Sequence, residues 1–415
     1  MSSAARKHPL NPVEPENMLD PVPLYGELRT SDPVHWSSVV NAWFLTRHDD
    51  VMNAFRDSRL SADRTRLAEF QMKSLVGDGA RDILAVLRDE MLMKDGKEHL
   101  RLRRSVSPGF TPQALDVWLP TIRRTMNRLV DAVLPRGRMD LATDIAYLMP
   151  PLVIAELFGI PAEEHTRFVA WAHPISEFFS PAMGVDMVAL ARRANQAMVE
   201  SRDFMTALIA ERMRAPGDDM LSQMVQRQEA GGASVDEMVA NALLVLSAGH
   251  LTTTDQLSNG LHALLTHPTE LSKLQENPGL VRSAVEEMLR YDPPIPWVHR
   301  VAAETFELRG RTIRQGDMVF LGMAAANRDP EAFSQPDRFD ISRDPHQQKH
   351  MSFAFGPHHC LGAGLARREL EVAISVLLER LPGLRLDEKQ LPRLKCHSLL
   401  FRGFESLPVR WTPGV

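Results

Sequence analysis

Residues 350–381 read HMSFAFGPHHCLGAGLARRELEVAISVLLERL and place Cys360 between a glycine-containing loop and a helix. Beyond Cys360, apolar side chains recur at helical spacing between charged ones, which predicts a half-buried helix. Cys360 would lie in the first turn of this helix, where unpaired backbone N–H groups and the helix dipole favour a thiolate over a thiol. The stretch therefore predicts a sulfur that is ready to bind a metal.

The loop also leaves space around this sulfur. Gly356 and Gly362 flank Cys360 without side chains, as a flat and bulky cofactor lying against the loop would require. Two alternatives compete with a cofactor site. Cys360 could be a buried small hydrophobic residue, or it could bind zinc together with His358 and His359. Adjacent side chains point apart, and the chain has no spaced second pair of ligands, which argues against zinc.

The spacing within the loop is more specific than its composition. It resembles the haem-binding loop of the cytochromes P450, in which a Phe, two glycines, a His or Arg, a Cys and a further Gly stand at fixed positions. The residues that match are Phe353, Gly356, His358, Cys360 and Gly362, while Ala354 stands where the first glycine is usual. In that family the cysteine thiolate is the axial ligand of haem iron. The resemblance implies haem b (iron protoporphyrin IX) as the cofactor and Cys360 as its axial ligand.

Composition is consistent with one large domain. The chain has 415 residues, of which 44% are hydrophobic and 24% charged, enough for a large core, and no linker or repeat divides it. With the resemblance, this predicts a mainly α, single-domain fold over residues 1–415, with a long central helix, small β-sheets and a flexible segment at residues 1–20. A net charge of −5 gives no electrostatic reason to expect nucleic acid.

Sequence also limits the compartment. The two cysteines, Cys360 and Cys396, argue against a disulfide framework and fit a reducing environment. The N-terminus lacks the apolar core of a signal peptide, and the chain lacks a run of about 20 apolar residues that could span a membrane. We therefore expect a soluble, cytoplasmic monomer without a membrane anchor. Within the resemblance, this is the bacterial type.

Two stretches predict elements before the middle of the chain. Residues 34–47 predict two short strands around a turn at Asn41, followed by a helix through Phe55. Residues 161–213 predict two amphipathic helices joined near residues 180–184, with aromatic side chains at the spacing that most often means core. In the family the equivalent helices form a lid, and an apolar inner face would suit a lipophilic or acyl substrate.

Three other stretches give less specific predictions or lie later in the chain. Residues 61–97 lack periodicity and correspond in the family to a variable loop above the haem. Residues 295–329 alternate as short strands with turns at residues 309–310 and 315–316. Residues 396–411 predict a terminal hairpin.

Basic residues follow the variable loop. His99 and Arg103 are four apart and share a helical face, where they could meet a pair of carboxylates, although a solvated basic helix fits the spacing as well. In the family a His-x-x-x-Arg pair at this place contacts the haem propionates, and Arg300 occupies another position from which a propionate is reached. A proximal basic patch suited to an acidic ferredoxin or a flavodoxin is predicted from Arg101, Arg104, Arg367 and Arg368.

Residues 235–268 predict a long helix through the centre of the molecule, because they are almost wholly apolar. Within it, Gly249 and the run Thr252–Thr254 are poor choices for a helix interior, since threonine hydroxyls compete for backbone carbonyls. Such a break often marks a functional site, but close packing against another helix is the alternative.

The same break carries the second resemblance. The family signature is Ala/Gly-Gly-x-Asp/Glu-Thr, and it is matched by Ala248, Gly249 and Thr252. Leu251 replaces the acid, so the acid–alcohol pair that relays protons in the family is half missing. Thr252 keeps its predicted catalytic role, while Asp255, one turn beyond it, or the neighbouring His250 could compensate through water. A hydroxyl or carboxyl group on the substrate is the remaining possibility.

A third motif lies before the loop. Glu287 and Arg290 are three apart on a predicted helix, so their side chains can pair. With Arg338 they resemble the family's buried Glu-Arg-Arg cluster, which is structural.

The resemblance implies a haem-thiolate monooxygenase. It would insert one oxygen atom from O2 into a C–H or C=C bond of a small lipophilic substrate or biosynthetic intermediate, free or bound to a carrier protein, with electrons from ferredoxin and ferredoxin reductase. The predicted pocket residues are Leu244, Ala248, Leu251, Trp297, Val298, Leu399 and Leu400. Because Leu251 replaces the acid, a peroxide-using or otherwise atypical oxidation stays open, and a non-catalytic haem-binding sensor is the alternative from another class.

Overall fold

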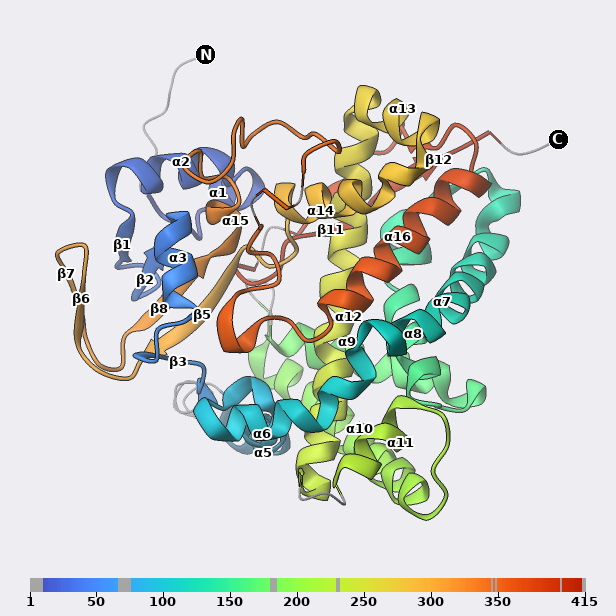
Figure 1. The fold of residues 1–415 in the computed structure, drawn as a ribbon, viewed down its shortest axis with the longest axis horizontal. Coiled ribbons are helices and arrows are strands. Elements are labelled where there is room, and N and C mark those ends of the chain that lie inside the picture. The colour runs from blue at the N-terminus through green and yellow to red at the C-terminus, as the bar shows by residue number, and fades with distance from the viewer. Residues whose placement is uncertain are drawn as a thin grey trace.

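Helix α12 (Val235–Thr266) runs through the centre of the molecule (Figure 1). Ser234 caps its N-terminus by accepting from the backbone N–H of Glu237, whose side chain accepts from the backbone of Ser234 in return. Its side chains are buried over most of its length, as expected for a helix that is apolar on all faces. The predicted long central helix is confirmed.

In this computed structural model the described residues are 10–65, 76–179, 185–228, 232–344, 346–347, 349–395 and 398–412.

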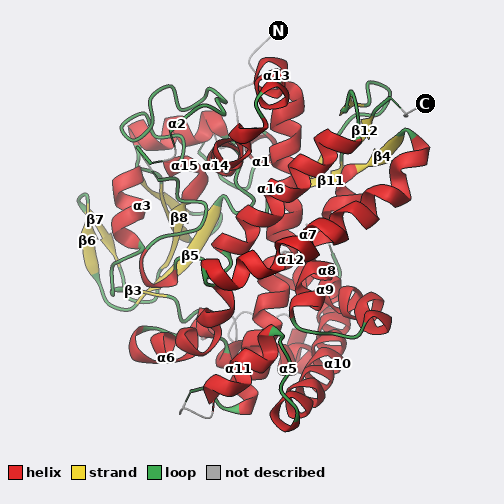
Figure 2. Cartoon of the chain, turned by 45° about the vertical axis from the view of Figure 1, so that its right-hand side comes forward, coloured by secondary structure: helices red, strands yellow, loops and turns green. Residues whose placement is uncertain are grey.

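Other helices pack around α12 on several sides. Those in contact with it include α5 (Arg81–Asp89), α8 (Met149–Leu157), α9 (His165–Phe179), α10 (Met187–Arg214), α14 (Val281–Tyr291) and α16 (Ala363–Arg380). The other α-helices in the described ranges are α1 (Pro15–Leu19), α2 (Val22–Ser31), α3 (His48–Ala54), α6 (Gly96–Val106), α7 (Pro112–Val133), α11 (Met220–Gln228), α13 (Pro268–Glu276) and α15 (Met323–Ala326). Figure 2 shows that helices dominate the fold, so the predicted mainly α class is confirmed.

Helices α9 and α10 confirm the two helices predicted in residues 161–213, and their predicted joint lies outside the described residues. The aromatic stripe of α9 is core. Phe168 and Trp171 are buried, and Trp171 donates through its indole N–H to Glu200 of α10 over 2.9 Å. These side chains therefore hold α9 against its neighbours.

A five-stranded sheet flanks the helices, with strand order β1-β2-β8-β5-β3. Its strands are β1 (Val34–Ser37), β2 (Ala42–Leu45), β3 (Leu60–Ser61), β5 (Trp297–Ala302) and β8 (Met318–Gly322). Asn41 turns the chain between β1 and β2 with φ of 55°, a conformation that asparagine tolerates. The strands predicted in residues 34–47 are thus confirmed.

The smaller sheets are formed mainly by the last third of the chain. β6 (Phe306–Leu308) and β7 (Arg311–Ile313) pair across the turn predicted at residues 309–310. The other short strands are β4 (Arg138–Asp140), β9 (Arg385–Leu386), β10 (Arg393–Leu394), β11 (Phe404–Ser406) and β12 (Pro408–Arg410). The predicted terminal hairpin is wrong, because β11 pairs with β10 while β12 pairs with β4 and β9.

Two other regions differ from expectation. Residues 10–20, part of the segment predicted to be flexible, include α1, and Asn17 is buried with its side-chain amide donating to the Asn11 carbonyl. Residues 61–97, predicted without elements, contain α5, whose apolar residues face the core. Across the described part of the chain, no helix has the length and apolar character needed to cross a membrane.

Candidate active site

Cys360 lies in the loop between the short helical turn Gly356–His358 and α16. Its backbone N–H donates to the Phe353 carbonyl over 2.9 Å, which closes the loop beneath the sulfur. The residue is exposed, yet burial raises the pKa of its thiol, so the sulfur faces a space inside the protein. Helix α16 begins at Ala363, so Cys360 precedes the helix and the prediction that it lies in the first turn is wrong.

Burial has the opposite effect on Cys360 from the helix dipole. The backbone N–H groups of Gly362 and Ala363 point at the sulfur and, with Arg103 and Arg367, lower its pKa, but burial outweighs them. Burial therefore opposes the effect on the Cys360 pKa that the helix N-terminus was predicted to have. A cationic partner such as a metal ion favours the thiolate form of the sulfur.

Two glycines of the loop and Ala354 differ in what their backbone and surroundings require. Gly356 has φ of +71°, and a Cβ atom there would meet the Phe55 carbonyl oxygen at 2.8 Å. A Cβ atom on Gly362 would stand 4.0 Å from the Cys360 sulfur, which is an ordinary van der Waals contact. Ala354 adopts φ of +57° with a side chain present, which costs free energy that a glycine would not.

The substitution Ala354→Gly is accordingly expected to stabilise the protein by about 1 kcal/mol, because it relieves a left-handed alanine. Asn41→Gly is the matched control, since Asn41 has a similar φ of 55° but tolerates it, and we expect a change of only a few tenths of a kcal/mol. The free energy of unfolding from urea denaturation measures both. A destabilised Ala354→Gly protein would contradict the assigned strain.

The middle of α12 differs from the rest of the helix because some of its residues are not buried. Ala248 is exposed although it lies at the centre of a buried helix, and Leu251 and Thr252 are half-buried on its flank. The Thr252 hydroxyl donates to the Ala248 carbonyl over 2.6 Å, which uses a backbone acceptor of the helix. Close packing explains Gly249, because a Cβ atom there would meet Ile154 of α8 at 2.7 Å. A space inside the protein therefore borders Ala248.

A cluster of cationic and imidazole groups lies beside the loop. The rings of His99 and His358 have centroids 4.0 Å apart, and the His358 ring is 3.7 Å from the Asp95 carboxylate. His99 is 1% exposed, and among the described residues its Nδ1 atom has no hydrogen-bond partner. Burial, the neighbouring His358 and Arg103 lower the pKa of His99 to about 4.

Arg300 completes this cluster. It is 4% exposed, its side chain donates to the His299 carbonyl, and within the described ranges no carboxylate pairs with it. Burial lowers its pKa to about 9, and the nearby Arg64 acts in the same direction. A buried cation without a paired anion calls for an anionic partner. The cluster therefore fits a ligand that carries carboxylates.

Two further arginines, Arg103 and Arg64, lie near the cluster. Arg103 donates to the His359 carbonyl over 2.7 Å, so part of its hydrogen-bonding capacity supports the loop. Arg64 is 8% exposed and donates to the carbonyls of Ala62 and Leu92. Sequence reasoning missed Arg64, because it stands in a stretch without periodicity.

Glu286 of α14 is a further residue that sequence reasoning missed. Its carboxylate accepts from the side chains of His350, over 3.1 Å, and Arg367, over 3.0 Å, and so ties both ends of the loop to α14. The Arg367 guanidinium lies 4.5 Å from the centre of the Phe353 ring. Burial raises the pKa of Glu286, but the hydrogen bonds outweigh it and hold this pKa at about 2.

The contacts of Glu286 predict how the free energy of unfolding falls at acid pH. Because the pKa of Glu286 is about 2 in the fold against 4.5 ordinarily, its stabilisation is present above pH 4.5 and is lost as pH falls toward 2. We expect wild type to lose about 3 kcal/mol more over this interval than Glu286→Gln. Urea denaturation at successive pH values measures the difference, with Glu163→Gln, an exposed carboxyl, as control. Parallel curves for wild type and Glu286→Gln would contradict the role.

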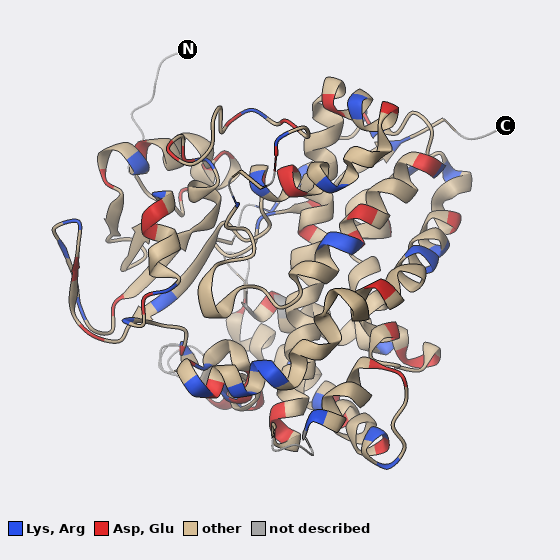
Figure 3. Ribbon diagram, viewed as in Figure 1, with Lys and Arg blue, Asp and Glu red and all other residues tan. Residues whose placement is uncertain are grey.

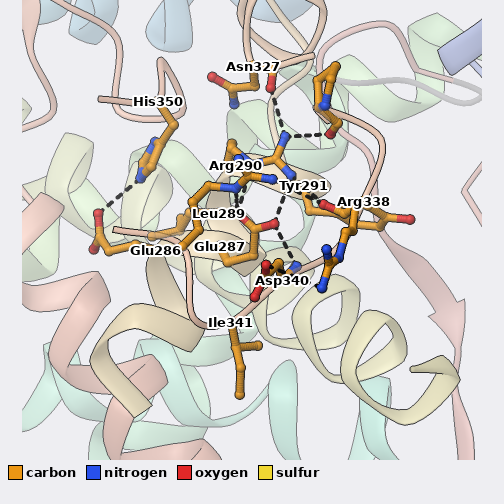
Figure 4. A network of polar contacts seen from close by, with 12 residues as sticks. Glu286, Glu287, Leu289, Arg290, Tyr291, Asn327, Arg338, Asp340, Ile341 and His350 are labelled. Carbon is orange, nitrogen blue, oxygen red and sulfur yellow. Dashed lines mark hydrogen bonds and ion pairs between the residues drawn. The ribbon is translucent and has the colours of Figure 1, made fainter. Parts of the chain in front are cut away.

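A buried network of polar contacts is centred on Glu287 and Arg290 of α14 (Figure 4). Glu287 and Arg290 are each 2% exposed and form two parallel hydrogen bonds of 2.7 and 2.8 Å. The guanidinium of Arg290 also donates to three backbone carbonyls, those of Asn327, Pro336 and Arg338. All the donors and acceptors of this pair are thus engaged.

The predicted third member of the cluster is wrong. The Arg338 side chain is 56% exposed and faces Asp340, so Arg338 contributes only its carbonyl. Arg343 takes its place and donates to Glu287 over 3.2 Å. The sequence motif identified the right loop but not the arginine that turns inward.

Neither predicted substitute for the missing acid faces Thr252 freely. His250 is fully buried, and its ring bonds to the Tyr147 carbonyl over 3.0 Å. Two residues along a helix rotate by about 200°, so His250 points away from Thr252. Asp255 is also fully buried, and one of its oxygens pairs with Lys395 over 2.6 Å.

The predicted pocket residues divide into two groups. Leu244 and Leu251 lie on α12 beside Ala248, and Val298 is half-buried on β5. Trp297 does not join them, because strand alternation turns its ring into a core with Tyr25 and Phe44 at centroid distances of 5.6 and 5.0 Å. Leu399 and Leu400 are half-buried against that same core.

Comparison with known proteins decides the family. The family model of cytochrome P450 matches residues 77–396. The chain belongs to the cytochrome P450 family. It is 34% identical to the biotin biosynthesis cytochrome P450 of Bacillus subtilis (strain 168), over 95% of this chain and 97% of that protein. It is likewise 34% identical to the polyketide biosynthesis cytochrome P450 PksS of the same organism, over 94% and 95%.

A solved structure agrees with this placement. The crystal structure of P450BioI in complex with an acyl carrier protein that carries hexadec-9Z-enoic acid is similar to this P450 with a TM-score of 0.86 and 33% identity, covering 96% of this chain and 99% of that one. The protein is therefore a P450 monooxygenase of the biosynthetic type, and members of the family bind haem b through a cysteine thiolate. The comparisons give no support to the peroxide-using or sensor alternatives.

The residues of this P450 fit the haem. Iron protoporphyrin carries two propionates, and the buried Arg300 and the open Nδ1 atom of His99 are suited to such anions. Gly362 places no side chain beside the Cys360 sulfur, and the small side chain of Ala248 is exposed in the middle of α12.

Proposed function

We propose that this P450 inserts one oxygen atom from O2 into a C–H or C=C bond of a lipophilic biosynthetic intermediate, with electrons from a ferredoxin. The observation that carries the proposal is that Cys360 and Ala248 are both exposed inside an otherwise buried region, beside buried cations without paired anions. When bound, haem supplies the activation of oxygen. The protein supplies the ligand, the pocket shape and the protons.

We assign the residues as follows. Cys360 is the axial ligand, and the propionates are held by His99, Arg103, Arg300 and His358, while Phe353, Gly356, Gly362 and Ala248 border the ring. Thr252, whose hydroxyl is anchored to the Ala248 carbonyl, presents its oxygen to the oxygen-binding side. Leu244, Leu251 and Val298 provide an apolar wall, which favours a substrate without charge at the reacting carbon.

The lipophilic character of the substrate is supported by two observations. The polar acid of the family signature is replaced by Leu251, which makes the wall of the pocket more apolar. The named relatives act in biotin and polyketide biosynthesis, and one similar structure holds an acyl chain on a carrier protein. We therefore propose an acyl or polyketide-type chain, presented free or on a carrier protein.

The electron donor is proposed to bind at α6 and the start of α7. The predicted patch is smaller than expected, because Arg101 pairs with Glu98 and Glu237, and Arg368 pairs with Asp116. Figure 3 shows positive and negative residues side by side on these helices. Lys97, Arg104 and Leu100 of α6 are exposed, so the contact would combine positive charge with apolar surface.

The test is a spectral titration of the haem-loaded protein, since displacement of water from the iron shifts the Soret band to shorter wavelength. The panel contains free fatty acids, polyketide lactones, and the same acyl groups attached to an acyl carrier protein, with short charged acids as controls. We expect a shift with at least one apolar class, and oxygenated product from it with ferredoxin, ferredoxin reductase and NAD(P)H. Shifts with the charged acids alone would contradict the proposal.

A further inference from the structure

A cavity of about 220 Å³ lies where helices α12 and α14 end, beside the start of α2, and we call it the α12–α14 cavity. None of the residues assigned above to the haem or to the substrate pocket lines it. The residues that decide its chemistry include Tyr25, His262, His267, Tyr291, Asp292 and Arg402. Since a cavity of about 150 Å³ suffices for benzene, the α12–α14 cavity can hold one substituted aromatic ring.

The buried and half-buried charges around the α12–α14 cavity already have partners. Arg402 donates to the Asp292 carboxylate over 2.7 Å. Arg328, which also lines the cavity, donates to the Asp337 carboxylate over 3.0 Å and to the Tyr291 carbonyl over 2.7 Å. An ion that entered the cavity would find no opposite charge of its own, and an unpaired buried charge costs free energy. The cavity is therefore suited to an uncharged ligand.

Aromatic rings form much of the wall. Tyr25, His262, His267 and Tyr291 all line the cavity, and the rings of His267 and Tyr291 meet edge to face with centroids 5.8 Å apart. Burial lowers the pKa of His262, which favours its uncharged ring. Such rings combine flat apolar faces with polar edges, and they pack well against another aromatic ring.

His267 supplies a hydrogen-bond acceptor. Its Nδ1 atom lies 2.7 Å from the Ala263 carbonyl oxygen. A carbonyl oxygen only accepts, so Nδ1 carries the proton, and Nε2 of the neutral ring is an acceptor. A ligand that donates a hydrogen bond therefore suits this side of the wall.

The hydroxyl of Tyr25 supplies the second polar group. Tyr25 is 3% exposed, and its ring packs edge to face against Trp297. The charges that act on its hydroxyl are those of Arg402, Asp292 and Arg328, which all line the cavity, so the hydroxyl lies on the cavity side. It forms no hydrogen bond with a described residue. Because buried hydroxyls almost always have a partner, this one calls for a ligand or water.

We propose that the α12–α14 cavity is a binding site for a small, uncharged phenol. The ring of the phenol packs against His262 and Tyr291, and its hydroxyl accepts from Tyr25 and donates to Nε2 of His267. The bound phenol joins α2 to the ends of α12 and α14, so it also stabilises the fold. The proposal does not depend on the monooxygenase function proposed above.

The first test is a crystal structure of the haem-loaded protein with 4-bromophenol, whose bromine is located by its anomalous scattering. We expect bromine in the α12–α14 cavity. The controls are 4-bromobenzoate and 4-bromobenzylamine, which have a similar size but carry a negative and a positive charge, and neither is expected there. A cavity that stays empty with 4-bromophenol, or that takes a charged compound instead, would overturn the proposal.

The second test compares two tyrosines by calorimetry with 4-bromophenol. Tyr25→Phe keeps the ring and removes the hydroxyl, and it should weaken binding about tenfold. Tyr147→Phe is the matched control, because Tyr147 is half-buried but does not line the cavity, and it should bind as wild type does. The Soret band reports any phenol beside the iron in the same samples, and its response should be equal in all three proteins. Equal affinities of Tyr25→Phe and wild type would contradict the assigned contact.

The third test fills the cavity. Ala263 lines it and is 4% exposed, so Ala263→Leu should remove the space for the phenol. We expect 4-bromophenol to raise the unfolding temperature of wild type but not that of Ala263→Leu. An equal rise in both proteins would place the phenol elsewhere and overturn the proposal. If Ala263→Leu does not fold, the two tyrosine variants decide. No turnover enters these tests, so a failure of the proposed reaction leaves their results unaffected.

Discussion

Cys360→Ser is expected to abolish oxygenation, because a serine hydroxyl does not replace a thiolate as the electron-donating axial ligand. The variant should fold, since the loop is closed by the backbone bond from residue 360 to Phe353 and by the contacts of Glu286, none of which uses the sulfur. Product formation with ferredoxin and a substrate that shifts the Soret band measures the effect, and circular dichroism checks the fold.

Cys396→Ser is the matched control for this substitution. It makes the same chemical change at the second cysteine of the chain, which lies outside the described residues. It should leave product formation unchanged. If instead Cys360→Ser retained full turnover, or if Cys396→Ser lost it, the assignment of the ligand would be wrong.

Glu287→Gln is expected to destabilise the fold by about 3 to 5 kcal/mol, because it leaves the buried Arg290 without its anionic partner. The substitution also weakens the bond from Arg343 and the one from the backbone N–H of Asp340. Urea denaturation gives the free energy of unfolding, and haem loss should accompany it because this cluster supports the loop.

The control is Glu379→Gln, which makes the same change in an ion pair at the surface. Arg123 and Glu379 are 2.6 Å apart but 48% and 54% exposed, so their pair should contribute less than about 1 kcal/mol. Similar losses in the two variants would contradict the structural role of Glu287. Such a result would mean that burial of the Arg290 pair adds nothing.

The sequence predicted those parts of the fold whose signals are local. The apolar run of α12, the turn at Asn41 and the spacing around Cys360 depend on residues close together in the chain, and each is found where expected. The pairing of strands with partners far away in the sequence could not be predicted in the same way. The terminal strands illustrate this, because β11 and β12 are neighbours in sequence but belong to different sheets.

Side-chain direction was the main limit for the site. Glu-x-x-Arg predicted the pair of Glu287 and Arg290, since both lie on one helix, but it could not tell whether Arg338 or Arg343 turns inward from a loop. His250 was chosen for closeness in sequence, yet it faces away from Thr252. The burial of Glu369 on α16 was not predicted, because Thr253, whose hydroxyl donates to its carboxyl group, lies on another helix, α12.

The central claim is that the sulfur of Cys360 binds the haem iron. The difference spectrum of the dithionite-reduced protein with and without carbon monoxide tests it most directly, because thiolate ligation moves the Soret band to a longer wavelength than imidazole or oxygen ligation does. We expect the long-wavelength band in wild type and its loss in Cys360→Ser. A wild-type band at the shorter position, or a long-wavelength band that survives Cys360→Ser, would contradict the claim.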